Sequence, residues 1–239
     1  MSRRRRKRRR PPTPHHDFDY RGALRQADQV LARNKAQPRP EDWPEVVLNW
    51  VTPEGPDRDE LARYIEAHHE RLGVGWARAM LRLEVFFQAD DDEAVIVHHD
   101  RALSRYPRCA LVELYVAVPL LRYDGDWWRA RPMLRYAADH LPGHARPCYE
   151  LGFLHYLLGD FPGALDWFNR AASRLTEHDG AMLASRIFYN RGIARFILEG
   201  DRKAARADTV QALEHDPGYE QAQEFLRVLR RRKVEWVPW

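Results

Sequence analysis

Two short histidine-rich motifs contain the residues in this sequence that are best suited to hold a metal ion. His68-His69-Glu70 and His98-His99-Asp100 lie thirty residues apart, and each offers two imidazoles and a carboxylate. These groups are ordinary zinc ligands. Adjacent residues on a helix point about 100° apart, however, so only one histidine of each pair can face a shared ion. We therefore expect no metal centre, and we expect His68 and His98 to be half-buried and the histidine after each to be solvated.

Other signatures of catalysis are missing from the sequence. It contains no Gly-rich phosphate loop, no nucleophile elbow and no His-Glu-x-x-His zinc helix. The acidic run Asp90–Glu93 could bind a cation, but we expect it to offset the N-terminal dipole of a helix. We predict no catalytic residues, no cofactor and no enzyme activity. A metal-dependent hydrolase using His68 or His98 is the reserve hypothesis.

The densest charge in the chain lies near its N-terminus. Eight basic residues follow one another there, namely Arg3, Arg4, Arg5, Arg6, Lys7, Arg8, Arg9 and Arg10. The whole chain carries +4, and subtracting the +8 of this run leaves −4 for the rest. Like charges repel and the prolines at 11, 12 and 14 disfavour a helix, so we expect residues 1–16 to be disordered. Such a tail could bind nucleic acid non-specifically, direct nuclear import, or serve only as a solubilising arm.

The composition of the chain as a whole is that of a folded, water-soluble protein. Hydrophobic residues make up 44% of the 239 residues and charged residues 31%. The longest apolar stretch, residues 114–121, falls far short of the ~18 residues that span a bilayer, so we expect no membrane partner. Cys109 and Cys148 are the only cysteines, which excludes a disulfide framework. We expect both to be buried, reduced thiols in a cytoplasmic protein.

The elements that must position any site are helices. Apolar residues recur at helical spacing from Phe18 onward, and alternation of period two never persists. The spacing predicts helices over residues 19–34, 44–51, 58–72, 75–88, 92–105, 109–123, 127–140, 146–158, 161–175, 181–198, 202–215 and 218–232. Three of the breaks share one signal: Gly125-Asp126, Gly159-Asp160 and Gly200-Asp201. A glycine that ends one helix and an aspartate that caps the next make short links, which force antiparallel packing.

These breaks recur at a spacing of 34 and then 41 residues. The best copy of the repeat, residues 145–178, carries Leu151-Gly152 in its first helix, Gly159-Asp160-Phe161 at its turn, and Ala164, Phe168 and Ala171 in its second helix. In these residues the chain resembles the tetratricopeptide repeat (TPR) family, whose unit is a 34-residue helical hairpin. The resemblance implies an all-α solenoid that winds as a right-handed superhelix.

Other copies match the repeat less closely. Residues 111–144 have Ala117-Val118 in place of Leu-Gly, and they put Pro119 in the middle of a helix, where it should introduce a kink. Residues 185–218 form a third copy and residues 75–108 a weaker fourth.

The sequence predicts five parts. They are a disordered tail (1–16), N-terminal helices and a Pro-rich linker (17–57), a degenerate repeat region (58–108), three TPR-like repeats (109–218), and a capping helix with an apolar tail (219–239). The capping helix has a basic outer face, which is expected of a solubilising end. In the apolar tail we expect Trp236 to pack back onto the cap, and the alternative is that it docks into a partner.

The resemblance also implies a concave face lined by the first helix of each repeat. Projecting the repeat onto this sequence places there Val112, Tyr115 and Arg122, then Arg146, Tyr149, Phe153 and Tyr156, and then Arg186, Tyr189 and Phe196. Aromatic and arginine side chains are typical of binding hot spots. The alternative is that some of the tyrosines belong to the core and reach the surface only through their hydroxyls.

Two functional hypotheses follow. The first is a non-enzymatic scaffold that binds a peptide or helix of a partner protein along this face. The second is a nucleic-acid- or ribosome-associated protein that is anchored by residues 3–10.

Overall fold

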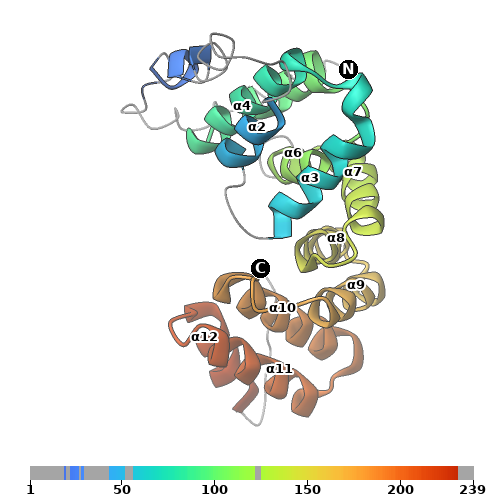
Figure 1. Cartoon of the computed structure of the whole chain (residues 1–239). Helices are drawn as coiled ribbons and strands as arrows, with labels where there is room; N and C mark the ends of the chain where they lie inside the picture. Colours follow the sequence, from blue (N-terminus) through green and yellow to red (C-terminus); the bar gives the residue numbers. More distant parts are fainter. Residues whose placement is uncertain are drawn as a thin grey trace, which may run out of the picture. The chain divides into compact units, whose positions relative to one another are not determined.

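The computed structural model describes residues 19, 22–26, 28–29, 43–51, 56–121 and 125–230. All regular structure in these ranges is helical, as the periodicity predicts (Figure 1). The α-helices are α2 (Trp43–Val51), α3 (Pro56–His68), α4 (Val74–Gln88), α5 (Asp92–His98), α6 (Ala110–Pro119), α7 (Trp127–His140), α8 (Ala145–Leu157), α9 (Phe161–Ser173), α10 (Ala181–Glu199), α11 (Arg202–His215) and α12 (Glu220–Arg230). No helix within these ranges is long and apolar enough to cross a membrane. The basic run at 3–10, Arg122, Trp236 and Trp239 lie outside the described residues.

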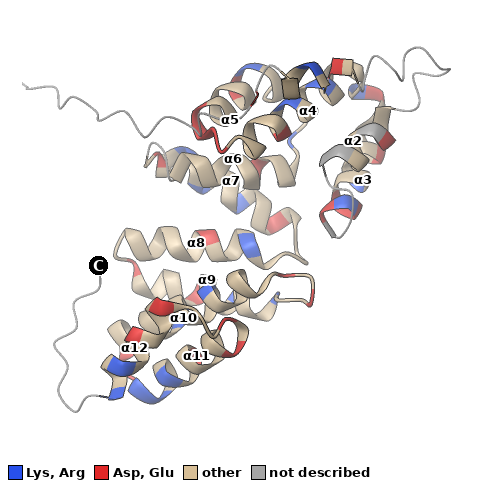
Figure 2. Ribbon diagram, turned by 90° about the vertical axis from the view of Figure 1, so that its left-hand side faces the viewer, with Lys and Arg blue, Asp and Glu red and all other residues tan. Residues whose placement is uncertain are grey.

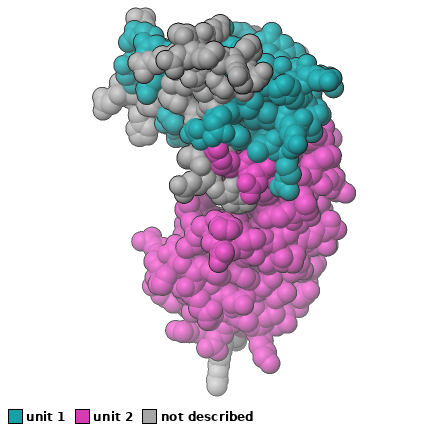
Figure 3. Space-filling view, in the orientation of Figure 1, with its two compact units in different colours: residues 1–54, 61–107 teal, residues 55–60, 108–239 magenta. Residues whose placement is uncertain are grey.

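The chain forms two compact units (Figure 3). Unit 1 comprises residues 1–54 and 61–107, and unit 2 comprises residues 55–60 and 108–239. The first turn of α3 therefore groups with unit 2, although the rest of this helix groups with unit 1. The predicted division of the chain into five parts stays a prediction.

Unit 2 is a row of antiparallel helical hairpins, α6–α7, α8–α9 and α10–α11, closed by α12, which packs on α11. Each hairpin turns at a glycine in the left-handed region, with φ of 57° at Gly125, 76° at Gly159 and 66° at Gly200. The aspartate that follows each glycine caps the next helix. The capping carboxylates accept backbone N–H bonds of 3.4 Å at Asp126, 3.0 Å at Asp160 and 2.9 Å at Asp201. The repeated Gly-Asp signal is therefore a repeated turn.

Small residues let the helices of a hairpin approach closely. Ala130, Ala164 and Ala205 are fully buried at equivalent positions of the three second helices. A Cβ added to Gly152 would lie 2.6 Å from Cδ1 of Phe168, and one added to Gly192 would lie 3.0 Å from the carbonyl oxygen of Ala205. Gly152 therefore has no room for a side chain while Phe168 faces it, and Gly192 has little room beside the backbone of α11.

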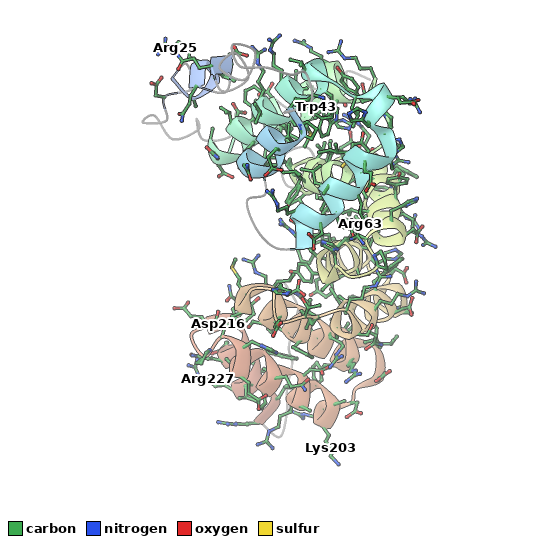
Figure 4. All side chains as sticks on the ribbon, viewed as in Figure 1. Arg25, Trp43, Arg63, Lys203, Asp216 and Arg227 are labelled. Atoms are coloured by element: carbon green, nitrogen blue, oxygen red, sulfur yellow. The ribbon has the colours of Figure 1, made fainter. Side chains whose placement is uncertain are left out.

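Unit 1 packs α2 against α4, and α4 against α5. Trp43 of α2 meets Trp76 of α4 edge-on, with ring centroids 5.7 Å apart, and Figure 4 shows Trp43 among the side chains of this unit. The turn between α4 and α5 is built like the turns of unit 2, except that an aspartate takes the place of the glycine. Asp90 takes the left-handed conformation, with φ of 51°, and Asp91 accepts a 2.9 Å bond from the N–H of Ala94. The acidic run thus caps a helix and complements its dipole, as expected.

Three predicted helices end four or more residues earlier than the pattern indicates. The helix expected over 58–72 is α-helical as far as His68, and His69–Arg71 form a 3₁₀ turn. The helix expected over 92–105 is α-helical only as far as His98, and residues His99–Leu103 form a π-helical turn. The helix expected over 109–123 has its last α-helical residue at Pro119 instead of bending there, and Leu120 and Leu121 continue as a π-type turn. Proline has no N–H to donate, so the ladder loses one bond at Pro119, although the N–H of Leu120 still reaches the carbonyl oxygen of Val116.

Candidate protein-interaction face

The sequence placed ten side chains on the concave face. Arg122 lies outside the described residues, Val112 is buried, and Phe196 packs against a core cluster. The other seven all belong to unit 2. They lie on the first helices of the three hairpins: Tyr115 on α6, Arg146, Tyr149, Phe153 and Tyr156 on α8, and Arg186 and Tyr189 on α10. We refer to these seven residues as the candidate face. They divide into an aromatic row on α8, a tyrosine cluster on α10, and a site on α6 that holds a carboxylate of the chain itself.

The aromatic row runs along α8. Tyr149, Phe153 and Tyr156 are spaced by four and then three residues, so they share one side of the helix. Their rings are nearly parallel, with centroids 6.3 Å apart for the first pair and 6.4 Å for the second. Phe161 at the start of α9 meets Tyr156 edge-on at 5.7 Å. Phe153 and Tyr156 are half-buried, so this row presents ring surface to solvent.

Tyr149 differs from the other two, because it is buried. Only 7% of its surface is exposed, and its ring lies 6.1 Å from that of Phe168 in the core. Its hydroxyl accepts a 3.4 Å bond from Nδ2 of Asn190, which links α8 to α10. The alternative that some of the predicted tyrosines are packing residues therefore applies at this position.

A cluster of tyrosines lies beside α10, around Tyr189. Tyr189 meets Tyr219 edge-on at 5.1 Å and Phe225 of α12 at 6.1 Å. Burial, together with the neighbouring phenols of Tyr219 and Tyr156, raises the pKa of Tyr189 to about 12. Burial also raises the pKa of Tyr219, against the nearby charge of Arg186. These phenols stay protonated at neutral pH, so the cluster presents hydroxyl groups beside one positive charge.

The site on α6 holds Asp57, from the first turn of α3. The hydroxyl of Tyr115 donates to Oδ2 of Asp57, and Nε2 of His144 lies 2.9 Å from its Oδ1. The guanidinium of Arg146 lies 5.7 Å from the centroid of the Tyr115 ring. Tyr115, which was predicted to face a partner, is thus engaged with a carboxylate of residues 55–60, and Arg146 lies over its ring.

The charges at this site stabilise one another. Burial by itself raises the pKa of Asp57, but hydrogen bonds from His144 and Tyr115 and the charges of His144 and Arg146 lower it overall. The hydrogen bond to Asp57 raises the pKa of His144, against the opposing effect of burial. Sequence reasoning missed Asp57 and His144, which are 87 residues apart. No local pattern connects two such positions.

The histidine motifs in unit 1 make contacts within the fold. Nε2 of His98 lies 2.9 Å from the carbonyl oxygen of Ala79, and burial lowers the pKa of this histidine. The His68 ring packs 4.9 Å from that of Tyr64. His99 was expected to be solvated, which is wrong: its side chain is only 14% exposed and lies 3.2 Å from the carboxylate of Asp100. Across the described ranges no group of three or more His, Cys, Asp or Glu is arranged to hold a metal ion.

Two further predictions concern buried thiols and the basic end of the repeats. Cys109 and Cys148 are buried and unpaired, and burial raises the pKa of Cys109 to about 11. On α12, Arg227 and Arg230 are exposed, as expected for a capping helix. Figure 2 shows basic residues along α11 and α12, and Figure 4 shows Lys203 projecting outward from the start of α11. This end of unit 2 is therefore solvated and basic.

Comparisons with known proteins support the fold and go no further. No family model matches this sequence, and no curated protein matches it. Among solved structures, the chain is similar to the crystal structure of YrrB, a TPR protein with an unusual peptide-binding site. The two align with a TM-score of 0.56 and 13% identity over 86% of this chain and 100% of the other. The chain therefore has the fold of a TPR-like helical repeat solenoid, built from hairpins that pack side by side.

Proposed function

We propose that this protein is a non-enzymatic scaffold that binds a peptide or helix of a partner protein on the candidate face. The fold is one in which stacked hairpins display a continuous surface to a partner. YrrB, which shares the fold, has a peptide-binding site. A protein or peptide partner is therefore the class that this architecture favours, and neither a cofactor nor catalysis is required.

The row of rings on α8 is the observation that carries the proposal. Phe153 and Tyr156 present parallel, half-buried rings beside α10, where Tyr189 and Arg186 add a phenol and a positive charge. Aromatic side chains offer a large contact area at a low cost in conformational freedom, and arginine is also enriched among the residues that dominate binding energy. A partner segment with apolar side chains and at least one carboxylate would match this surface.

The part of the candidate face on α8 and α10 is the better candidate for first contact. Tyr115 on α6 is engaged with Asp57, and Tyr149 at the start of α8 is buried. We therefore assign the partner contacts to Phe153, Tyr156, Arg186 and Tyr189. Arg122, which was predicted to extend the face on the first hairpin, stays a prediction.

Site-specific photocrosslinking tests this assignment. A photoreactive phenylalanine analogue at position 153 of the full chain, irradiated in cells, should form a defined adduct with one protein. The same analogue at Asn169, an exposed position on α9, serves as the matched control. Adducts from both positions alike, or from Asn169 alone, would contradict the assignment.

The identified partner then allows a quantitative test. Replacing Phe153 and Arg186 together by alanine should weaken its affinity by at least about 100-fold, which corresponds to ~2.8 kcal/mol. Replacing Asp166 and Arg170, an exposed ion pair of 3.0 Å on α9, should leave the affinity unchanged. Circular dichroism must show that both variants remain folded. If the first variant binds as tightly as the unmodified chain, the proposal fails.

A further inference from the structure

Three exposed leucines at the ends of α8 and α10 form what we call the apolar edge. Leu157 is 59% exposed, Leu158 is 46% exposed and Leu198 is 43% exposed. The first two directly precede the turn at Gly159, and the third lies two residues before the turn at Gly200. Because hairpins of a solenoid pack in the same orientation, their internal turns lie along one side. The three leucines therefore lie on the side of unit 2 where its hairpins turn.

The C-terminal ends of α8, α10 and α12 meet beside this edge. A core cluster of Ile193, Ala205, Phe225 and Leu229 joins α10, α11 and α12. Partly buried side chains pack against this cluster from the ends of two helices, namely Tyr156 from α8 and Phe196 and Ile197 from α10. Each of these two helix ends continues directly into the apolar edge. Leu157 directly follows Tyr156, and Leu198 directly follows Ile197, so both leucines neighbour in sequence a residue that packs on this cluster.

The chain leaves α12 on this same side. Nη2 of Arg202, at the start of α11, donates a 3.3 Å bond to the carbonyl oxygen of Leu229. The end of α12 thus lies next to the turn at Gly200, and Figure 2 shows the α8–α9 turn and the end of α12 on one side. Whatever follows Arg230 in the sequence starts beside the apolar edge.

The sequence that follows is suited to cover it. Nine residues come after Arg230: Arg231, Arg232, Lys233, Val234, Glu235, Trp236, Val237, Pro238 and Trp239. Nine extended residues span at most about 30 Å, whereas packed helices lie only about 8–10 Å apart, so the segment can reach both helix ends. A buried tryptophan removes roughly 150–250 Å² of surface from water, the largest contribution of any side chain. Two tryptophans provide enough apolar surface to cover three leucines.

We infer that residues 234–239 dock within their own chain onto the apolar edge, with Trp236 and Trp239 as the anchors. The occupant is a segment of this protein, and the surface it covers is Leu157, Leu158 and Leu198. This inference does not rest on the partner proposed above, because none of the three leucines belongs to the candidate face.

Disulfide trapping in the full chain tests the inference. Leu198→Cys is combined with Val237→Cys, and the matched control combines Met182→Cys with Val237→Cys. Met182 is 61% exposed and lies on the same helix, sixteen residues or about 24 Å from Leu198. Under mild oxidation at low protein concentration, the Leu198 pair should form an intramolecular disulfide at least tenfold faster than the Met182 pair. Equal rates would overturn the inference.

A second variant separates docking from mere proximity. Adding Trp236→Ala and Trp239→Ala to the Leu198→Cys, Val237→Cys chain keeps the length of the segment and removes its anchors. The rate of intramolecular trapping should then fall at least fivefold. An unchanged rate would overturn the inference, since closeness of the chain end would then suffice. Disulfide-linked dimers in place of the intramolecular product would also overturn it, because the occupant would then be a second copy.

Discussion

The hairpins α6–α7 and α8–α9 have the same type of turn, but their two helices pack against each other differently. Both turn at a left-handed glycine followed by a capping aspartate. Thirty-four residues separate equivalent positions, so Val118 corresponds to Gly152 and Leu134 to Phe168. In α8–α9 the Phe168 ring fills the space in front of Gly152, whereas in α6–α7 both Val118 and Leu134 are buried. One hairpin thus pairs a small residue with a large one, and the other pairs two of intermediate size.

This difference shows that the conformation of the turn depends on one residue, whereas the packing between the two helices depends on a pair of side chains. A turn requires one conformation at one residue, so its signal can be repeated unchanged. A packed contact requires only that the summed volume of two side chains fill the space. The hairpin α10–α11 uses a further solution, in which Gly192 faces the backbone of Ala205 and the side chain of Thr209.

The largest expected effect comes from exchanging one of these solutions for another. Gly152→Val should lower the free energy of unfolding by about 3 kcal/mol, because the new side chain overlaps the Phe168 ring. Adding Phe168→Leu recreates the pairing of α6–α7 and should restore at least half of the loss. Urea denaturation of both variants measures this. If the double variant is as unstable as the single one, the two hairpins do not accommodate the same total side-chain volume at these two positions.

The first hairpin differs from the second in another respect, because Tyr115 of α6 binds the carboxylate of Asp57. His144→Gln should lower the free energy of unfolding by about 1.5 kcal/mol at pH 6, since a charge-assisted hydrogen bond is lost. The raised pKa of His144 means that its contribution is complete below about pH 6.5 and is lost as pH rises through the folded-state value. The lowered pKa of Asp57 means that its contribution is present above about pH 3.9 and is lost in more acidic solution.

Stability measured from pH 4 to 8 therefore checks the pairing. The unmodified chain should lose stability between pH 6.5 and 8 relative to the His144→Gln variant, as this site titrates. His178→Gln, at a side chain that is 61% exposed, is the control and should follow the unmodified chain. Identical pH profiles for the unmodified chain and the His144→Gln variant would contradict the pairing.

The smallest effects concern the turns themselves, and they extend the comparison to α4–α5 in unit 1. Asp90 holds the left-handed conformation that glycine holds in unit 2. Asp90→Gly should stabilise the protein by about 0.5 kcal/mol, and Gly159→Asp should destabilise it by about 1 kcal/mol, because a side chain is strained at positive φ. Thermal unfolding of the two variants gives the signs. If both substitutions shifted stability in the same direction, the four turns would not share one conformational requirement.

The helices and their turns could be predicted from the sequence, because both are local. Periodic apolar residues and the Gly-Asp signals predicted α7 and α11 to the residue, and α8 and α9 to within two. The ends of α5 and α6 were misplaced, because the apolar pattern continues past both while the backbone changes to a π-type turn at His99 and at Leu120. The resemblance to the TPR family likewise rested on local residues at fixed spacing.

The sequence alone therefore determined the all-α hairpin architecture, since each turn and each apolar stripe lies within a few residues of chain. Tertiary structure decided which aromatic side chains are packing and which are surface. It buried Tyr149 against Phe168 and left the rings of Phe153 and Tyr156 half-exposed, although all three share one side of α8. It also set Asp57 beside Tyr115 and His144, because contacts between distant segments depend on how whole helices pack.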